Sequence, residues 1–284
     1  MTYRTTISVQ ELHSALRSQD DILVFACEFD LADTTRGCRL FEAGHIPGAR
    51  FIDLTTELSA PAGSNGRHPL PARDRFGATM RSHGLRTEQQ VVVYDSSANA
   101  WAPRLWWLLR WIGHANVAVL DGGLAAWTAA EYRIERGEAG KHGLRGDVTV
   151  GASLVGIADV REIEASLQAD APYLLDGRSA DRFRGVPNPV DPVSGHIPGA
   201  GSRPFTDNMG ENGLFKSREQ LARDFTELLR DRRASEVVLY CGSGVTACNN
   251  ALAMEIAGLP GARLYPGSWS EWIADPGRPV ERTD

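Results

Sequence analysis

The sequence has few cysteines, no surplus of positive charge and no long apolar run. None of its four cysteines forms a C-x-x-C pair, which argues against a disulfide scaffold and a zinc knuckle. The net charge of −6 gives no basic surface for nucleic acid, and no stretch is long enough to span a membrane. The N-terminus lacks the features of a signal peptide, so we expect a cytoplasmic protein. The cysteines are Cys27, Cys38, Cys241 and Cys248.

The chain repeats itself. The hexapeptide "GHIPGA" occurs at 44–49 and again at 195–200. The run "VVVYD" ends at Asp95, and the similar run "VVLYC" ends at Cys241. Further along, "LDGGLAAW" and "YPGSWSEW" align by their glycine and tryptophan. Three landmarks in the same order indicate a duplicated domain.

Short apolar runs alternate with helical patterns in each copy, which predicts an α/β fold with a parallel sheet flanked by helices. We expect an N-terminal domain at 1–140, a linker rich in glycine and charge at 141–155, and a C-terminal domain at 156–284. In the C-terminal copy the patterns predict strands at 171–176, 235–241 and 262–267, and helices at 218–232 and 245–259.

The stretch "YCGSGVTACNN" at 240–250 places a lone thiol after an apolar run. The carboxyl end of a parallel strand is where α/β folds bind ligands. Gly242 and Gly244 allow successive backbone N–H groups to turn inward, and the helix that follows adds its positive end. Such a nest favours an anion, here the Cys241 thiolate or a persulfide built on it. The pattern therefore predicts a nucleophilic cysteine.

Two other interpretations of Cys241 fit the sequence less well. A cysteine phosphatase needs arginine at the sixth position after its cysteine, and that position holds Ala247. A buried structural cysteine needs no glycine-rich nest. Cys248 lies within the predicted helix, and we expect it to be part of the core.

Together with "APRLWWLLR" at 102–110 and "GSWSEW" at 267–272, these motifs resemble the two-domain rhodanese-like sulfurtransferases along nearly the whole chain. The loop "CGSGVTA" is similar to that of the 3-mercaptopyruvate sulfurtransferases in this family. The resemblance implies a rhodanese fold in each half and catalysis in the C-terminal half alone. Asp95 agrees with this, because it stands at the position of Cys241 and a carboxylate cannot carry a persulfide.

The resemblance also implies which residues bind the substrate. Arg182 matches the first of two arginines that hold mercaptopyruvate in the family, and the loop itself supplies no cation for an anionic donor. The second position holds Asp191, so Arg178 or Arg184 would have to replace that arginine. From the residues alone, Arg178 fits a pair with an internal carboxylate better than a contact with substrate.

Catalytic roles follow from the same resemblance. Cys241 would attack the sulfur of the donor and become a persulfide. Ser243 and His68 match two members of a Ser-His-Asp relay whose acid position holds Thr55. An ordinary loop serine and an ordinary surface histidine fit the sequence equally well. The loop around Cys241 comprises Gly242, Ser243, Gly244, Val245 and Thr246.

The expected reaction transfers sulfur from 3-mercaptopyruvate to a thiol or cyanide by a ping-pong mechanism, without a metal or an organic cofactor. Thiosulfate enzymes of the family carry an Arg-Lys pair after the cysteine, where this chain has Gly242 and Ser243. Thioredoxin is a further candidate acceptor. Two alternatives stay open: a thiosulfate:cyanide sulfurtransferase, and a non-catalytic persulfide carrier.

Overall fold

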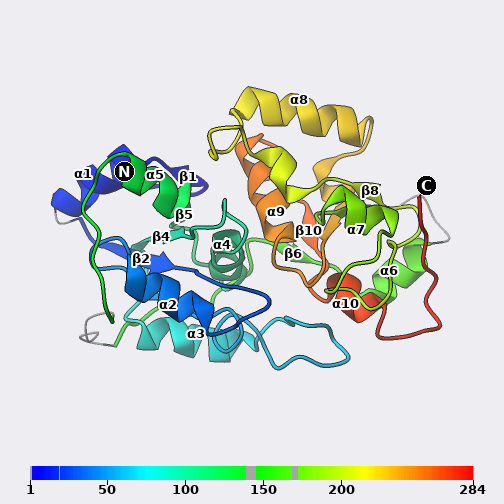
Figure 1. The fold of residues 1–284 in the computed structure, drawn as a ribbon, viewed down its shortest axis with the longest axis horizontal. Coiled ribbons are helices and arrows are strands. Elements are labelled where there is room, and N and C mark those ends of the chain that lie inside the picture. Colours follow the sequence, from blue (N-terminus) through cyan, green and yellow to red (C-terminus); the bar gives the residue numbers. More distant parts are fainter. Residues whose placement is uncertain (1, 19, 139–144, 168–171, 284) are drawn as a thin grey trace. The chain divides into compact units, whose positions relative to one another are not determined.

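The structure, a computed structural model, describes residues 2–18, 20–138, 145–167 and 172–283 (Figure 1). Among the helices of these residues, none has both the length and the apolar composition that crossing a bilayer requires. The chain forms two compact units, each with its own five-stranded sheet. Unit 1 comprises Met1–Ala60, Pro71–Leu154 and Glu211–Leu214, and unit 2 comprises Pro61–Leu70, Val155–Gly210 and Phe215–Asp284.

Unit 1 contains a parallel sheet with the strand order β1-β5-β4-β2-β3. Its central strands are continuous apolar runs, as expected for strands that are covered on both faces. The strands are β1 (Thr6–Ile7), β2 (Ile22–Ala26), β3 (Arg50–Phe51), β4 (Gln90–Tyr94) and β5 (Val117–Leu120). The helices are α1 (Val9–Arg17), α2 (Arg36–Ala43), α3 (Arg73–Ser82), α4 (Ala102–Trp111) and α5 (Gly123–Ala129).

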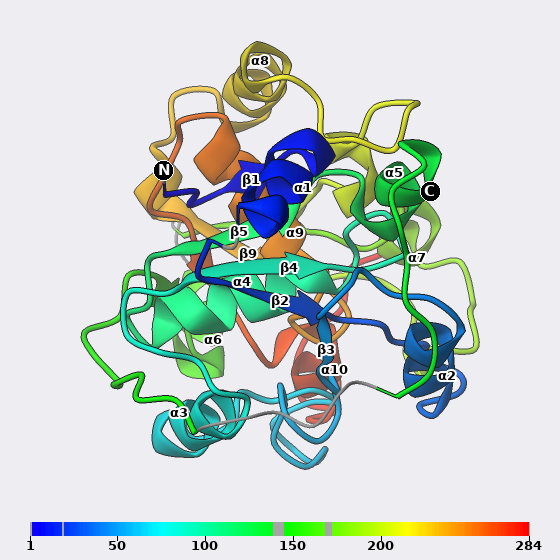
Figure 2. The ribbon, with the colours of Figure 1, turned by 90° about the vertical axis from the view of Figure 1, so that its left-hand side faces the viewer.

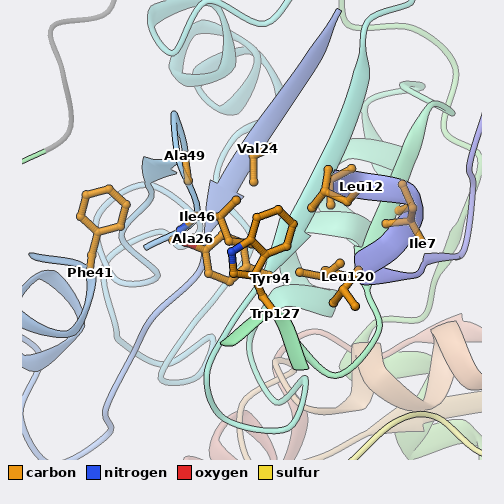
Figure 3. Packing of buried hydrophobic residues seen from close by; sticks show 13 residues of the cluster. Ile7, Leu12, Val24, Ala26, Phe41, Ile46, Ala49, Tyr94, Leu120 and Trp127 are labelled. Atoms are coloured by element: carbon orange, nitrogen blue, oxygen red, sulfur yellow. Dashed lines mark hydrogen bonds between the residues drawn. The ribbon is translucent and has the colours of Figure 1, made fainter. Parts of the chain in front are cut away.

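Helices cover both faces of this sheet. Figure 2 shows α1 and α5 on one side of β2 and β4, and α3 and α4 on the other. Residues two apart along a strand point to the same face, so alternate residues of β2 and β4 join one core cluster with α1 and α5 (Figure 3). In that cluster Trp127 of α5 and Leu12 of α1 are 2% and 0% exposed.

Unit 2 contains a parallel sheet with the order β6-β10-β9-β7-β8, the same arrangement as in unit 1. The expected α/β fold is confirmed, and all five elements predicted in this half exist, with shorter ends. The strands are β6 (Gly156–Ile157), β7 (Tyr173–Asp176), β8 (Gly201–Ser202), β9 (Val237–Tyr240) and β10 (Arg263–Leu264). The helices are α6 (Val160–Ser166), α7 (Ala180–Arg184), α8 (Arg218–Leu229), α9 (Ala247–Ile256) and α10 (Ser268–Trp272), with 3-10 turns at Phe205–Asn208 and Ala234–Glu236.

The two "GHIPGA" segments adopt the same structure. The Nδ1 atom of His45 lies 2.9 Å from the carbonyl oxygen of Phe41, and its ring stacks on the Phe41 ring. His196 repeats both contacts with Phe183, with an Nδ1 to oxygen distance of 2.8 Å. Both histidines are buried, so their role is to fix a turn in each unit.

The segment Pro61–Leu70 belongs to unit 2, although it falls within the range 1–140 assigned to the N-terminal domain from the sequence. Gly66 permits this packing, because its φ is +103° and an added Cβ atom would lie 2.8 Å from the carbonyl oxygen of Gly267. The backbone N–H of the next residue, Arg67, donates to Ser270 Oγ at 3.0 Å. Unit 2 therefore contains both Arg67 and His68.

The predicted linker at 141–155 lies partly outside the described residues, because residues 141–144 are not among them. From residue 145 onward its backbone bonds to unit 1. The N–H of Gly146 donates to the carbonyl of Arg81, and that of Gly151 to the carbonyl of Ile112, both at 2.8 Å. This part of the predicted linker is thus hydrogen-bonded to unit 1.

Glu28 is a buried acid of unit 1. Its Oε2 accepts hydrogen bonds from the Ser96 hydroxyl at 2.6 Å and the Ser96 N–H at 3.2 Å. Within the described residues, Oε1 has no hydrogen-bond partner. Burial raises the pKa of Glu28 to about 7, and the nearby Asp95 carboxylate adds to this effect, while the bonds from Ser96 oppose it.

This raised pKa predicts a pH-dependent stability. The free energy of unfolding of the wild type, relative to Glu28→Gln, should fall by about 3 kcal/mol as pH rises from 4.5 to 7, because the folded state resists ionisation that the unfolded chain allows. Denaturant unfolding at several pH values measures this difference. The exposed Glu227→Gln serves as the control and should track the wild type. A pH-independent difference between wild type and Glu28→Gln would contradict the prediction.

Candidate active site

Cys241 is the first residue after β9, at the carboxyl end of the central strand of unit 2. Its N–H donates to Ser268 Oγ at 3.1 Å, and its carbonyl accepts from the N–H of Trp269 at 2.9 Å. The carbonyl of Gly242 accepts from the N–H of Ser270 at 2.9 Å. Hydrogen bonds with the first residues of α10 thus fix the backbone of Cys241 and Gly242.

The loop curls tightly before α9 begins at Ala247. Gly244 has a φ of +74°, and an added Cβ atom would lie 2.2 Å from the carbonyl oxygen of Pro266, so no other residue fits there without a shift of the backbone. Cys248 is buried in the first turn of α9, and its thiol lies 3.4 Å from the carbonyl oxygen of Gly244. This position matches the expectation of a core cysteine.

Several N–H groups of the loop have no hydrogen-bond acceptor in the part of the chain that the structure describes. Among the described residues, no acceptor is found for the backbone N–H groups of Gly242, Ser243, Val245 and Thr246. Cys241 itself is 1% exposed. Burial alone would also fit a structural cysteine, but Gly242, Ser243 and Val245 are buried residues as well, and buried N–H donors without acceptors are costly unless an anion meets them. The loop therefore has the properties of an anion nest.

The corresponding loop of unit 1 shows this nest with an anion in it. Asp95 follows β4 as Cys241 follows β9, and it is 1% exposed. Its Oδ1 accepts the N–H groups of Ser97 and Asn99 at 2.8 and 3.0 Å, and its Oδ2 those of Trp101 and Ala102 at 2.9 and 2.8 Å. Burial raises the pKa of Asp95, and these four donors oppose the rise. The loop at the corresponding place in unit 1, one residue longer, thus binds a carboxylate with its backbone N–H groups.

Arg182 and Asp191 lie beside the loop. The guanidinium of Arg182, on α7, donates to both oxygens of Asp191 at 2.8 Å. An added Cβ atom on Gly242 would lie 2.8 Å from Arg182 Nη2, so the cation borders the cysteine loop directly. Asp191 is 2% exposed in its side chain. The sequence suggested a missing arginine at this position; the structure shows the counter-ion of the arginine that is present.

Arg178 also reaches Asp191, at 3.3 Å, but most of its donors go elsewhere. Its Nη2 donates to Asp176 at 2.6 Å and to the carbonyl of Gly195 at 2.7 Å, and its side chain is 1% exposed. Burial alone would lower the pKa of Arg178, but the Asp176 carboxylate outweighs burial and raises it. These contacts favour the internal ion pair over substrate binding.

Arg184 lies on the surface. Its side chain is 47% exposed and pairs with Asp181. Its guanidinium therefore has a partner away from the cysteine loop, unlike that of Arg182.

Arg67 is the functional candidate that sequence reasoning missed. Its Nη1 donates to the carbonyl of Val190 at 3.1 Å, and its Nη2 lies 3.8 Å from Asp191 Oδ1. The same Nη2 would lie 3.3 Å from a Cβ atom on Gly242. The sequence suggested Arg178 or Arg184 as the second cation, whereas the structure places Arg67 beside the loop. The signal available was the position of Arg67 next to His68 in "GRHPLP".

Ser243 and His68 meet, as the relay hypothesis requires. Nδ1 of His68 lies 2.8 Å from Ser243 Oγ, and both residues are buried. A surface histidine, the alternative for His68, is therefore excluded. Ser243 stands two residues after Cys241 in the chain, and its contact with the His68 imidazole forms a pair that can transfer a proton.

The chain is similar to known proteins along nearly its whole length. The rhodanese-like domain family matches the chain twice, at residues 8–130 and 159–275. A Pseudomonas aeruginosa protein named "Probable 3-mercaptopyruvate sulfurtransferase" is 47% identical over all of both chains. Mouse thiosulfate sulfurtransferase is 31% identical over 95% of this chain and 92% of its own. The solved 3-mercaptopyruvate sulfurtransferase from Leishmania major superposes with a TM-score of 0.83, at 29% identity, over 95% of this chain and 74% of its own.

The chain therefore belongs to the rhodanese-like family and consists of two such domains. It is a sulfurtransferase, an enzyme that moves sulfur from a small-molecule donor to an acceptor.

The role of Asp191 as a shared counter-ion predicts its effect on stability. Asp191→Asn should lower the free energy of unfolding by about 2–4 kcal/mol, because it leaves the half-buried guanidinium groups of Arg67 and Arg182 without their shared carboxylate. Asp181→Asn is the matched control, since Asp181 also pairs with an arginine of this segment but is 69% exposed, and it should change stability by less than about 0.5 kcal/mol. Denaturant unfolding compares them, and equal losses would contradict the assignment.

Proposed function

We propose that the protein transfers sulfur from 3-mercaptopyruvate to a thiol or to cyanide through a persulfide on Cys241. The observation that carries the donor is the set of charges beside Gly242. Two guanidinium groups, Arg67 and Arg182, share one carboxylate, Asp191, so these three side chains carry a net charge of +1 beside the loop. A monoanionic carboxylate donor brings one negative charge to them and to the Cys241 thiolate, whereas the dianion thiosulfate brings two into a largely buried site, where surplus negative charge is costly.

The first half-reaction balances without a co-reactant. The Cys241 thiolate attacks the sulfur of the donor, so that an S–S bond forms and the C–S bond of mercaptopyruvate breaks. The electron pair of the C–S bond goes to carbon, which gives the enolate of pyruvate. The proton of the donor's S–H group then moves to that carbon, and the products are the persulfide anion and pyruvate.

The nest stabilises the charge that this step leaves on sulfur. The loop N–H groups without an acceptor and the N-terminus of α9 follow Cys241 directly in the chain, so they are suited to stabilise an anion built on that sulfur. Ser243 and His68 suit the proton transfer from sulfur to carbon, because their contact at 2.8 Å forms a short relay within the loop.

The second half-reaction transfers the outer sulfur of the persulfide to the acceptor. Cyanide attacks the outer sulfur of the persulfide, the S–S bond breaks, and thiocyanate leaves while the Cys241 thiolate is regenerated. A thiol acceptor attacks the same atom. Thioredoxin is a protein acceptor of suitable chemistry, and a reducing cytoplasm suits a chain whose four cysteines are free.

Two rival functions lead to different observations. Thiosulfate as donor is favoured by Asp191, which stands where mercaptopyruvate enzymes are expected to have an arginine, and by the similarity to mouse thiosulfate sulfurtransferase. A persulfide carrier without turnover would accept one equivalent of sulfur and stop. Multiple turnovers with cyanide and a donor distinguish the enzyme from the carrier.

The nucleophile assignment predicts the outcome of cysteine replacement. Cys241→Ser should abolish sulfur transfer with the fold intact, because a hydroxyl cannot form a persulfide. Cys248→Ser should keep most activity, since that thiol is buried against Gly244. Mass spectrometry of donor-treated wild type should find the added sulfur on Cys241 alone. Label on Cys27, Cys38 or Cys248 would refute the assignment.

The relay predicts a loss in turnover rather than in binding. Ser243→Ala and His68→Gln should each lower kcat with mercaptopyruvate by about 10- to 100-fold with little change in KM, and the double variant should lose little more than either single one. Ser166→Ala is the matched control, because Ser166 is equally buried, at 8% exposure, and bonds only to a backbone carbonyl. Additive losses in the double variant would argue against a shared relay.

A further inference from the structure

A cavity of unit 2 lies between α8 and β8, the edge strand of its sheet, and no residue of the cysteine loop lines it. Its volume is about 940 Å³, and Leu228 is the one apolar residue in its lining. Four basic and three acidic residues line it, which gives a net charge of +1 in a protein of net charge −6. The cavity therefore suits a polar ligand that carries negative charge.

Two of the basic residues are fixed by the protein itself. Arg203 Nη2 and Lys216 Nζ lie 3.3 and 3.0 Å from the same carboxylate oxygen, Oδ2 of Asp224. Arg203 Nε also donates to Oδ1 of Asn208 at 3.1 Å, and the buried Asn208 donates in turn to two asparagines of α9. Hydrogen bonds thus fix this side of the cavity in place, and Asp224 neutralises one of its two cations.

The other two basic residues, Arg230 and Arg232, form no ion pair within the described residues. The guanidinium carbon of Arg232 lies 4.5 Å from the centre of the Tyr173 ring. This cation–π contact orients the guanidinium plane and uses none of its N–H donors. Both arginines therefore keep their donors for an anionic ligand.

Arg230 has a backbone conformation that favours glycine. It follows α8 with φ +55° and ψ −119°, and the N–H of Arg232 donates to the carbonyl of Leu229 at 3.1 Å. These values define a type II′ turn, in which the first central residue is normally glycine. Such strain is typical of residues whose side chain has a function. Here it keeps a cation at the cavity where glycine would be the relaxed residue.

The chemistry of the remaining lining residues narrows the ligand. Ser202 Oγ is buried and has no hydrogen-bond partner within the described residues. Two guanidinium forks and a hydroxyl match the oxygens of a phosphate group. Asp207 and Glu227 also line the cavity, and their carboxylates can accept hydrogen bonds from hydroxyl groups but repel a second anionic group.

We propose that this cavity binds a small phosphate ester with a hydroxylated organic part. Arg230 and Arg232 bind the phosphate group, and the acidic residues accept hydrogen bonds from the hydroxyl groups. The volume of about 940 Å³ is in the range of pockets for organic ligands, which favours an ester over inorganic phosphate. The site is separate from sulfur transfer at Cys241 and adds a binding function to unit 2.

Isothermal titration calorimetry at fixed ionic strength tests this with glucose 6-phosphate, inorganic phosphate and glucose as probes. The wild type should bind glucose 6-phosphate more tightly than phosphate, and glucose should not bind. Arg230→Gly and Arg232→Gln should each weaken the binding of glucose 6-phosphate by about ten-fold or more. Arg230→Gly should at the same time raise the midpoint of thermal unfolding by about 2 °C, because glycine adopts this turn without strain.

Arg233→Gln is the matched control, because Arg233 stands three residues after Arg230, is exposed and pairs with Glu236 outside the cavity. Arg182→Gln removes a cation beside Cys241 and should also leave the affinity for glucose 6-phosphate unchanged. No binding by the wild type, or equal losses in Arg233→Gln or Arg182→Gln, would overturn the site. Equal affinity for phosphate and glucose 6-phosphate would overturn the assignment of an ester. A lower thermal midpoint in Arg230→Gly would show that Arg230 is structural and would overturn its role as a ligand-binding residue.

Discussion

The site depends on one constraint, namely that backbone N–H groups buried at the end of a parallel strand require an anion. Unit 1 meets this need with the Asp95 carboxylate, which accepts four of them. In unit 2 the strand is followed by Cys241, and no acceptor is found among the described residues for the N–H groups of Gly242, Ser243, Val245 and Thr246. A persulfide extends the side chain by one charged sulfur atom. In the proposed mechanism the unfilled nest therefore favours the persulfide intermediate over the resting cysteine.

Charge around the loop is the second constraint. Three arginines, Arg67, Arg178 and Arg182, converge on Asp191 from two separate segments. Arg178 is neutralised by its own partner Asp176, which leaves the other two to share one carboxylate. This arrangement holds two cations close together in a protein of net charge −6, which otherwise repels anionic donors. In the proposed mechanism, these side chains and not the cysteine loop select between monoanionic and dianionic donors.

Much of this could be predicted from the sequence. The duplicated landmarks and the apolar runs predicted two parallel sheets, because strands covered on both faces must be apolar throughout. The glycines after Cys241 predicted the nest, because the motif is local in sequence. The packing of Pro61–Leu70 into unit 2 could not be predicted, since that segment has no periodicity and its contacts come from residues around 190 and 270. For the same reason the sequence does not point to Arg67. It shows Asp191 as a missing arginine, and only the structure shows it as a counter-ion.

The charges at the loop are proposed to select a monoanionic donor. The most direct measurement is the ratio of kcat/KM for 3-mercaptopyruvate to that for thiosulfate in the wild-type protein, with cyanide as acceptor and at fixed ionic strength. A net charge of +1 from Arg67, Arg182 and Asp191 predicts a ratio well above one, by about ten-fold or more. A ratio at or below one would contradict the account.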